Sequence, residues 1–228
     1  MNPPPATAQP LAAERIQHPG LRARRLSADA AAALIQPGWN VGMSGFTGAG
    51  YPKAVPQALA RRIEAAHAAG QPWRIGLWTG ASTAPELDGA LAKVDGIDLR
   101  LPYQSDPTVR AQINSGHMQY VDIHLSHVAQ FVWFGFLGHL NVAVIEVAGI
   151  LPDGRLVPST SVGNNKTWID QADHVILEVN HWQNPGLEGM HDIYYGTALP
   201  PHRQPIMMTE PGQHIGEPYL HCDPAKVI

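Results

Sequence analysis

Two kinds of hydrophobic pattern alternate along this chain. Short apolar runs predict buried strands at 40–43, 73–78, 97–101, 141–147 and 174–179. The segments between them carry helical periodicity or a capping residue, which predicts helices at 27–35, 53–69, 84–93, 107–115, 124–134 and 166–172. Strand, loop and helix in this repeated order indicate an α/β fold, with a mainly parallel sheet and helices on both faces.

The two ends of the chain are patterned differently from its middle. Residues 1–20 are rich in Pro and Ala without an apolar core region, so we expect a disordered lead-in, not a secretory signal, before one domain at 21–228. The Pro152-Asp153-Gly154 sequence predicts a hairpin turn into a short strand at 155–157. After Asn180, prolines and glycines dominate, and 205–208 is a weakly patterned strand.

Ligands bind parallel sheets at the loops that follow the carboxyl ends of the strands. That rule places the loops 44–50, 80–83 and 103–106 on one rim. The first of them lies in 41–53, a glycine-rich stretch that carries Gly42, Gly45, Gly48 and Gly50. Because glycine tolerates positive φ and lets the backbone approach a ligand closely, we expect the amides of this loop to bind one.

The order of residues in this loop excludes three common motifs. It lacks the Gly-Lys-Ser/Thr ending of a P-loop and the G-x-G-x-x-G order of a dinucleotide site. A nucleophile elbow is disfavoured because Phe46 stands where its second glycine belongs. The histidines 117, 124 and 127 have no metal-site spacing, and no metal is expected. Glu146 and Glu178 lie in apolar strands, where an ionised carboxylate needs a partner or a shifted pKa. Each could be a functional carboxylate or a side chain that alternates out of the sheet, and the sequence leaves both possibilities open.

Composition narrows the class of protein. The 228 residues carry a formal net charge of −4 with 44% hydrophobic and 15% charged residues, which is typical of a globular protein and argues against nucleic-acid binding. No apolar run has the length of a membrane span. The single cysteine, Cys222, excludes an intrachain disulfide and fits a reducing compartment, so we expect a cytoplasmic protein. Arginines near residue 20 leave an organellar transit peptide open, although Glu14 and the prolines weigh against it.

Four stretches resemble one enzyme family in order and spacing. Residues 45–52, GFTGAGYP, are similar to the G-F-x-x-x-G-x-P loop of class I coenzyme A transferases. The wider SGFTGAGYPKAVP resembles the acetyl-CoA hydrolase and acetate (succinate) CoA-transferase branch of that family. The other three stretches are TGASTAPELDG (79–89), VPSTSVGNN (157–165) and EVNHWQNPGLEGMHDIY (178–194).

The resemblance implies a fold of the NagB/RpiA/CoA-transferase-like type, with two related α/β domains in tandem. It also implies catalysis through a glutamate that forms an acyl anhydride and then a glutamyl-CoA thioester. That glutamate belongs to a Glu-Asn-Gly-type motif of the second domain, and this sequence contains no Glu-Asn pair. We therefore expect an N-terminal domain whose catalytic partner domain is absent, inactive by itself, and we assign it no catalytic residue.

The resemblance also assigns binding roles to the domain that is present. Backbone amides of the glycine loop are expected to line the carboxylate or pantetheine side of the site, at Gly45, Phe46, Thr47, Gly48, Ala49 and Gly50. Ser82 and Ser105 are expected to hydrogen-bond a small carboxylate, unless they only cap helices or turns. Lys53 is a candidate for a CoA phosphate.

The expected reaction moves CoA between small acyl groups such as acetyl and succinyl, or hydrolyses acetyl-CoA. Coenzyme A would then be a substrate, and no permanently bound cofactor is expected. The partners implied are acyl-CoA, small carboxylates, the missing C-terminal domain or subunit, and a second copy in a homodimer of the complete enzyme. The alternative is a non-catalytic assembly subunit that pairs with a separately encoded catalytic half.

Overall fold

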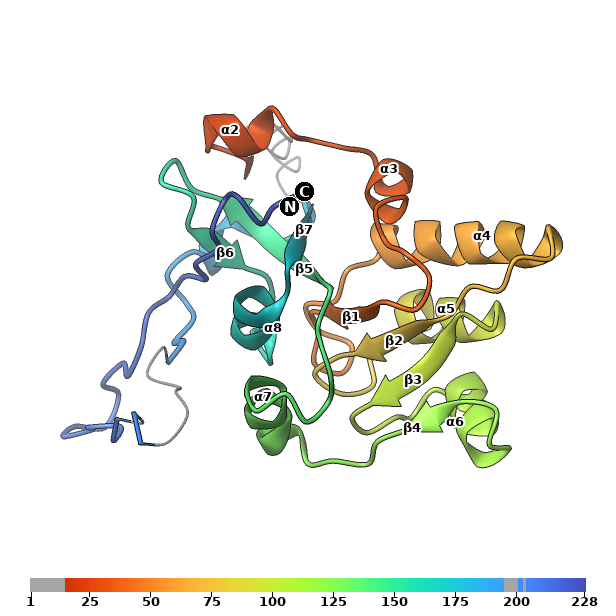
Figure 1. Cartoon of the computed structure of the whole chain (residues 1–228). Helices are drawn as coiled ribbons and strands as arrows, with labels where there is room; N and C mark the ends of the chain where they lie inside the picture. Colours follow the sequence, from red (N-terminus) through yellow and green to blue (C-terminus); the bar gives the residue numbers. More distant parts are fainter. Residues whose placement is uncertain (1–14, 195–200, 203) are drawn as a thin grey trace, which may run out of the picture.

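The computed structural model describes residues 15–194, 201–202 and 204–228, and the strands in that part of the chain form one seven-stranded sheet (Figure 1). Neighbouring strands in the order β4-β3-β2-β1-β5 all pair in parallel. On its other edge β5 pairs in parallel with β7, and its second half pairs antiparallel with β6. The mainly parallel α/β sheet is thus confirmed. The strands are β1 Asn40–Met43, β2 Ile75–Trp78, β3 Ile97–Leu101, β4 Gln119–Tyr120, β5 Val142–Ile150, β6 Leu156–Pro158 and β7 His174–Val179.

Helices cover both faces of the sheet, as the sequence predicts (Figure 1). The first face carries α3 (Ala28–Ala32), α4 (Ala54–Ala68), α5 (Ala90–Lys93) and α6 (Pro107–Asn114). The second face carries α7 (Leu125–Trp133) and α8 (Asn165–Gln171). Three short elements complete the described fold: α2 (Pro19–Arg22), the π-helical turn η1 (Pro85–Gly89) and the 3-10 turn η2 (Pro185–Leu187). In the described residues, no helix is both long and apolar enough to cross a membrane.

The central strand β5 shows why both faces need cover. All nine of its residues are buried, and its first four, Val142 to Ile145, alternate between the two large hydrophobic clusters. Val144 packs under α4, whereas Ile145 packs on the side of Trp168 in α8. A strand buried on both faces has a continuous apolar sequence, which explains the NVAVIEV pattern.

Several boundaries differ from those predicted. The strand predicted at 73–78 begins only at Ile75, and the helix predicted at 84–93 starts as the π-helical turn η1 before it becomes α5. The strand predicted at 205–208 is wrong: these four residues form no strand and are exposed. Short apolar runs fix a strand only when the sheet offers them a partner, and here none is offered.

The expected lead-in overlaps the packed domain over its last residues. Residues 1–14 lie outside the described residues, but Arg15 and Ile16 are buried, and Ile16 forms an isolated parallel bridge with Ile150. The Arg15 guanidinium donates to the backbone oxygens of Ala148 (3.0 Å) and Gln183 (2.7 Å). This segment therefore packs against the end of β5 before the predicted domain boundary at residue 21.

Candidate functional site

The three predicted loops meet at the carboxyl edge of the sheet, because β1, β2 and β3 are parallel neighbours. The amide of Gly80 donates to the carbonyl oxygen of Gly45 at 3.0 Å, which joins the first loop to the second. The Ser105 hydroxyl donates to the Ser82 oxygen at 2.8 Å, which joins the second loop to the third. The prediction that these loops share one rim is confirmed.

The glycine loop is a tight turn. Phe46 and Ala49 exchange backbone hydrogen bonds of 2.9 and 3.1 Å, and Thr47 between them has a φ of +50°. The amides of Phe46 and Ala49 are therefore used inside the turn, which leaves the exposed tip, Thr47 and Gly48, to offer amides to a ligand. Binding by the amides from Gly45 to Gly50 stays a prediction, and two of these six amides, those of Phe46 and Ala49, already have acceptors within the turn.

Two of the loop's glycines are required by packing. Gly45 has a φ of +124°, and a Cβ there would lie 2.7 Å from the Tyr51 Cβ. Gly50 has a φ of +66° and lies directly under Ser161, whose hydroxyl donates to the Ala49 carbonyl oxygen at 2.9 Å. A side chain at Gly45 would collide with Tyr51, and one at Gly50 would push the turn away from Ser161 in the segment after β6. The VPSTSVGNN stretch thus packs directly against this loop at Gly50.

Beside the turn, a group of polar side chains lies at the ends of β2 and β3. Ser82 and Gln104 are buried, and the Ser82 hydroxyl donates to the Gln104 Oε1 at 3.2 Å. Gln104 Oε1 also accepts from the amide of Asp106 (3.2 Å), while its buried Nε2 has no partner among the described residues. The sequence analysis missed Gln104, although it lies in the loop that was predicted to bind. A buried donor without a partner next to two serines suits a carboxylate oxygen.

A buried ion pair lies beneath this group. Arg100 in β3 and Asp88 in η1 are both fully buried, with Nη2 and Oδ1 3.0 Å apart. Arg100 also donates to the Thr79 hydroxyl (2.7 Å), and Asp88 accepts from the amide of Thr83 at 2.6 Å. Burial lowers the pKa of Arg100, and the charge of Asp88 opposes that shift. The pair thus holds both ends of the 79–83 loop. The sequence analysis missed this pair, although an arginine within the otherwise mostly apolar strand IDLRL could have indicated that it needs a buried partner.

A second buried carboxylate, Glu146 in β5, lies under the start of α4. The Lys53 ammonium is 2.5 Å from its Oε2, and Asn180 (3.1 Å) and Gln183 (3.2 Å) donate to the same carboxylate. Lys53 Nζ also lies 3.9 Å from the ring centroid of Tyr51. Lys53 therefore faces Glu146, and binding a CoA phosphate would require its ammonium to leave that pair. The phosphate role of Lys53 stays a prediction.

The other strand carboxylate, Glu178 in β7, caps α4. Its two oxygens accept from the backbone amides of Lys53 (2.6 Å), Ala54 (3.1 Å) and Val55 (2.9 Å). These amides have no partner within a helix, and a carboxylate at a helix N-terminus is stabilised by the helix dipole. The sequence left open whether these glutamates are functional or simply point out of the sheet. In the structure, Glu146 is held in a buried ion pair and Glu178 caps a helix, so both contact the scaffold around the rim.

Among the described residues, no group of three His, Cys, Asp or Glu side chains is placed to hold a metal ion. His124 and His127 contact each other edge to face with ring centroids 5.7 Å apart, and His117 pairs with Asp95. Burial, followed by the charges of Glu86 and Glu146, raises the pKa of Tyr51, whose hydroxyl lies 3.3 Å from Glu86.

Comparison with known proteins gives one consistent result. A family model described as "Acetyl-CoA hydrolase/transferase N-terminal domain" matches residues 20–202. The chain is 40% identical over 214 residues to a succinyl-CoA:acetate CoA-transferase of Clostridium kluyveri, covering 94% of this chain and 39% of that protein. It is 41% identical over 204 residues to a propanoyl-CoA:succinate CoA transferase of Escherichia coli, covering 90% of this chain and 41% of that protein. The chain thus spans about two fifths of the length of these relatives.

Solved structures support the fold. RipA from Yersinia pestis superimposes with a TM-score of 0.54 at 17% identity, over 75% of this chain and 37% of that one. A glutaconate coenzyme A-transferase from Acidaminococcus fermentans superimposes with a TM-score of 0.50 at 10% identity, over 67% of this chain and 65% of that one. At these identities the likeness concerns the fold alone.

Proposed function

Because this chain belongs to the acetyl-CoA hydrolase/transferase family, through that family's N-terminal domain, we propose that it forms one wall of a CoA-transferase or acetyl-CoA hydrolase active site. The substrates of the complete enzyme would be small acyl-CoAs such as acetyl-CoA and succinyl-CoA, with acetate, succinate or water as acceptor. Coenzyme A is then a substrate and not a resident cofactor. The proposal rests most on one observation: the exposed glycine turn lies beside the polar group formed by Ser82, Gln104 and Ser105.

This arrangement suits a carboxylate in contact with a thioester. The Gln104 Nε2 supplies an unused donor for a carboxylate oxygen, and the Ser82 and Ser105 hydroxyls would supply two more by turning from their present acceptors, Gln104 Oε1 and the Ser82 oxygen. The Thr47 and Gly48 amides supply donors for a developing oxyanion. Phe46 and Tyr103, which are 44% and 60% exposed, offer apolar surface at the same rim for an acyl or pantetheine chain. Fixed donors of this kind lower a barrier because they need no reorganisation during the reaction.

The covalent nucleophile is proposed to come from polypeptide outside this sequence. Glu146 is an unsuitable nucleophile because it is fully buried and held by Lys53, Asn180 and Gln183. Glu178 is occupied by three amides of α4. Both carboxylates therefore stabilise the wall of the site that this domain provides, and the second half of the enzyme would provide the opposite wall. We expect the complete enzyme to be a homodimer.

A binding experiment tests this function on the chain itself. Titration with succinate, acetate and CoA, followed by amide NMR, is expected to shift the signals of 45–50 and 80–83. Ser82→Ala is expected to weaken the carboxylate response about fivefold to tenfold, as loss of one hydrogen bond does. Ser115→Ala, on the exposed end of α6, is the matched control and should leave the response unchanged. Carboxylate shifts that map away from the rim would contradict the proposal.

A second candidate function is an assembly subunit that pairs with a separately encoded catalytic half. The observation behind it is that Glu146 and Glu178 both hold scaffold contacts, so the nucleophile has to come from other polypeptide, whether or not that polypeptide is joined to this chain. Co-expression with a polypeptide that carries a Glu-Asn-Gly motif separates the two candidates. Thioester exchange that appears only when two separate chains are mixed supports the subunit, and activity that needs one continuous chain supports the first proposal.

A further inference from the structure

The outer edge of β7 is paired over only part of its length. Val175 donates its amide to the Lys226 carbonyl oxygen (2.8 Å) and accepts from the amide of Ile228 (3.0 Å), so residues 226–228 run parallel to β7. Leu177 and Val179 lie two and four residues further on and present their backbone groups on the same side. In the described parts of the chain, no backbone segment pairs with these two residues on that side.

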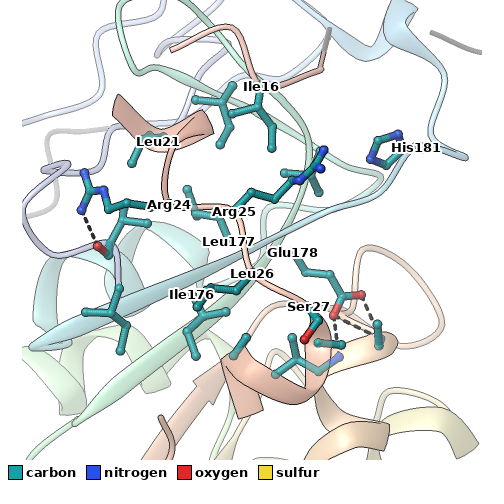
Figure 2. A pocket seen from close by; sticks show the side chains of 18 residues that line it. Ile16, Leu21, Arg24, Arg25, Leu26, Ser27, Ile176, Leu177, Glu178 and His181 are labelled. Atoms are coloured by element: carbon teal, nitrogen blue, oxygen red, sulfur yellow. Dashed lines mark hydrogen bonds between the residues drawn. The ribbon is translucent and has the colours of Figure 1, made fainter. Parts of the chain in front are cut away.

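A cavity of about 250 Å³ lies along this unpaired edge (Figure 2). Its lining comes from the residues around α2, from α3 and the start of α4, from the end of β5, from β7 and from the C-terminal residues. Apolar side chains such as Leu21, Leu26, Leu177, Val179 and Ile228 line it together with the charged Arg24, Arg25 and Glu178. The Arg24 guanidinium donates to the Val227 carbonyl oxygen at 2.6 Å, on the side of 226–228 that faces away from β7. The chain between α2 and α3 thus contacts residues 226–228 on the side away from β7.

We propose that the groove accepts the residues that immediately follow Ile228 in a polypeptide of the relatives' length, added as a strand parallel to β7. The parallel register places the Ile228 carbonyl oxygen opposite the amide of Leu177. The second residue after Ile228 then donates to the Leu177 carbonyl oxygen and accepts from the amide of Val179. Since Val227 and Ile228 pack against the clusters on opposite faces of the sheet, the added residues are apolar at consecutive positions.

The direction of this strand has a consequence for the active site. A strand parallel to β7 ends at the carboxyl edge of the sheet, next to Glu178 and the first turn of α4. Polypeptide that leaves the strand there emerges on the same edge as the glycine turn. The groove would therefore deliver the second half of the enzyme to the proposed site. This consequence rests on the proposed function, whereas the strand pairing itself does not.

Three tails added to the complete chain test the pairing. The first is Val-Ile-Val-Thr, the second is Gly-Ser-Gly-Ser, and the third is Val-Pro-Val-Thr, in which proline removes the donor for the Leu177 carbonyl. Amide hydrogen exchange is followed by NMR at Val179, with Gln119 and Tyr120 on the opposite edge of the sheet as internal references. The Val-Ile-Val-Thr tail is expected to slow exchange at Val179 by about fivefold or more, the factor of an ordinary hydrogen bond. The other two tails are expected to leave it unchanged or nearly so.

Two results would overturn the inference. Exchange at Val179 that is the same with all three tails would show that the groove does not accept a strand in this register. Protection of Val179 that depends on protein concentration in the chain without a tail would assign the edge to a second copy. Neither result touches the CoA binding experiment, so the two proposals fail separately. A sequence of the longer polypeptide that is polar or proline-rich directly after Ile228 would also count against the inference.

Discussion

The Lys53 ammonium lies 2.5 Å from the Glu146 carboxylate, and the two side chains differ sharply in exposure: 38% for the lysine and 0% for the glutamate. Glu146 therefore depends on Lys53 for most of its compensating charge, while Lys53 retains contact with water. The same lysine is the N-cap residue of α4, and only Tyr51 and Pro52 separate it from Gly50 of the glycine loop. The pair thus fixes the point at which the turn joins the helix.

Removing Lys53 is expected to destabilise the chain more than removing the pair. In Lys53→Met the buried carboxylate keeps only Asn180 and Gln183, and we expect a loss of about 2–4 kcal/mol of unfolding free energy. The double variant Lys53→Met/Glu146→Gln removes the uncompensated charge, so its loss of unfolding free energy should be smaller than that of Lys53→Met alone. It should therefore also be smaller than the sum of the losses in the single variants Lys53→Met and Glu146→Gln. Urea unfolding followed by circular dichroism measures all four proteins. Strictly additive losses would show that the two side chains are not coupled.

Glu178 is expected to contribute through the N-terminus of α4. Glu178→Ala leaves three amides without their carboxylate and should cost about 1.5–3 kcal/mol, whereas Glu178→Gln keeps one acceptor and should cost less. Glu64→Gln, on an exposed position of the same helix, is the control and should change stability by less than about 0.5 kcal/mol. Equal effects of Glu178→Gln and Glu64→Gln would rule out a charged cap.

Much of the fold follows from local sequence signals. β5 and β7 have nearly continuous apolar sequences, each interrupted by one glutamate, and β5 is buried along its whole length. α4 has both a clear period and a glycine after its last turn. The short elements were harder to predict. The turn η1 depends on Asp88 binding Thr83 and Arg100, and the ordering of Arg15 depends on carbonyls more than 130 residues away. No pattern within a short window of sequence contains those partners.

The candidate site, like the fold, could be predicted from the sequence only in part. The three rim loops could be predicted because parallel strands bring their carboxyl ends together, and the packing of Ser82 on Ser105 agrees with that rule. What local sequence could not give was the use of each polar group. Lys53 points towards Glu146, and the Phe46 and Ala49 amides each donate to the other residue's carbonyl oxygen. Such choices are made by tertiary partners, since any buried polar group must find one.

The buried pair of Asp88 and Arg100 is expected to control the shape of the 79–83 loop. Asp88→Ala leaves a fully buried guanidinium without its counter-charge, and we expect a loss of about 3–5 kcal/mol. It also removes the acceptor of the Thr83 amide, so that amide should exchange faster in folded protein. Asp98→Ala, at an exposed position of β3, is the control and should have little effect on stability or on Thr83 exchange. An Asp88→Ala protein with unchanged stability would show that the charge is compensated elsewhere.

Cys222 is expected to react slowly with alkylating reagents while the chain is folded. Burial raises the pKa of its thiol from 9.0 to about 11, and Lys226 opposes the shift only in part. At pH 8 the thiolate fraction, and with it the rate of reaction with iodoacetamide, should be about 100-fold lower than in the urea-unfolded chain, since each unit of pKa is a factor of ten.

The same pKa shift makes the stability of the folded chain depend on pH. As the pH rises above 9.0 the unfolded chain loses its thiol proton first, so this group lowers stability progressively until the pH passes about 11. Cys222→Ser removes the thiol and should abolish both the alkylation and this part of the stability loss at high pH. Equal alkylation rates in folded and unfolded chain at pH 8, with N-acetylcysteine as the reference thiol, would contradict the raised pKa of this partly buried thiol.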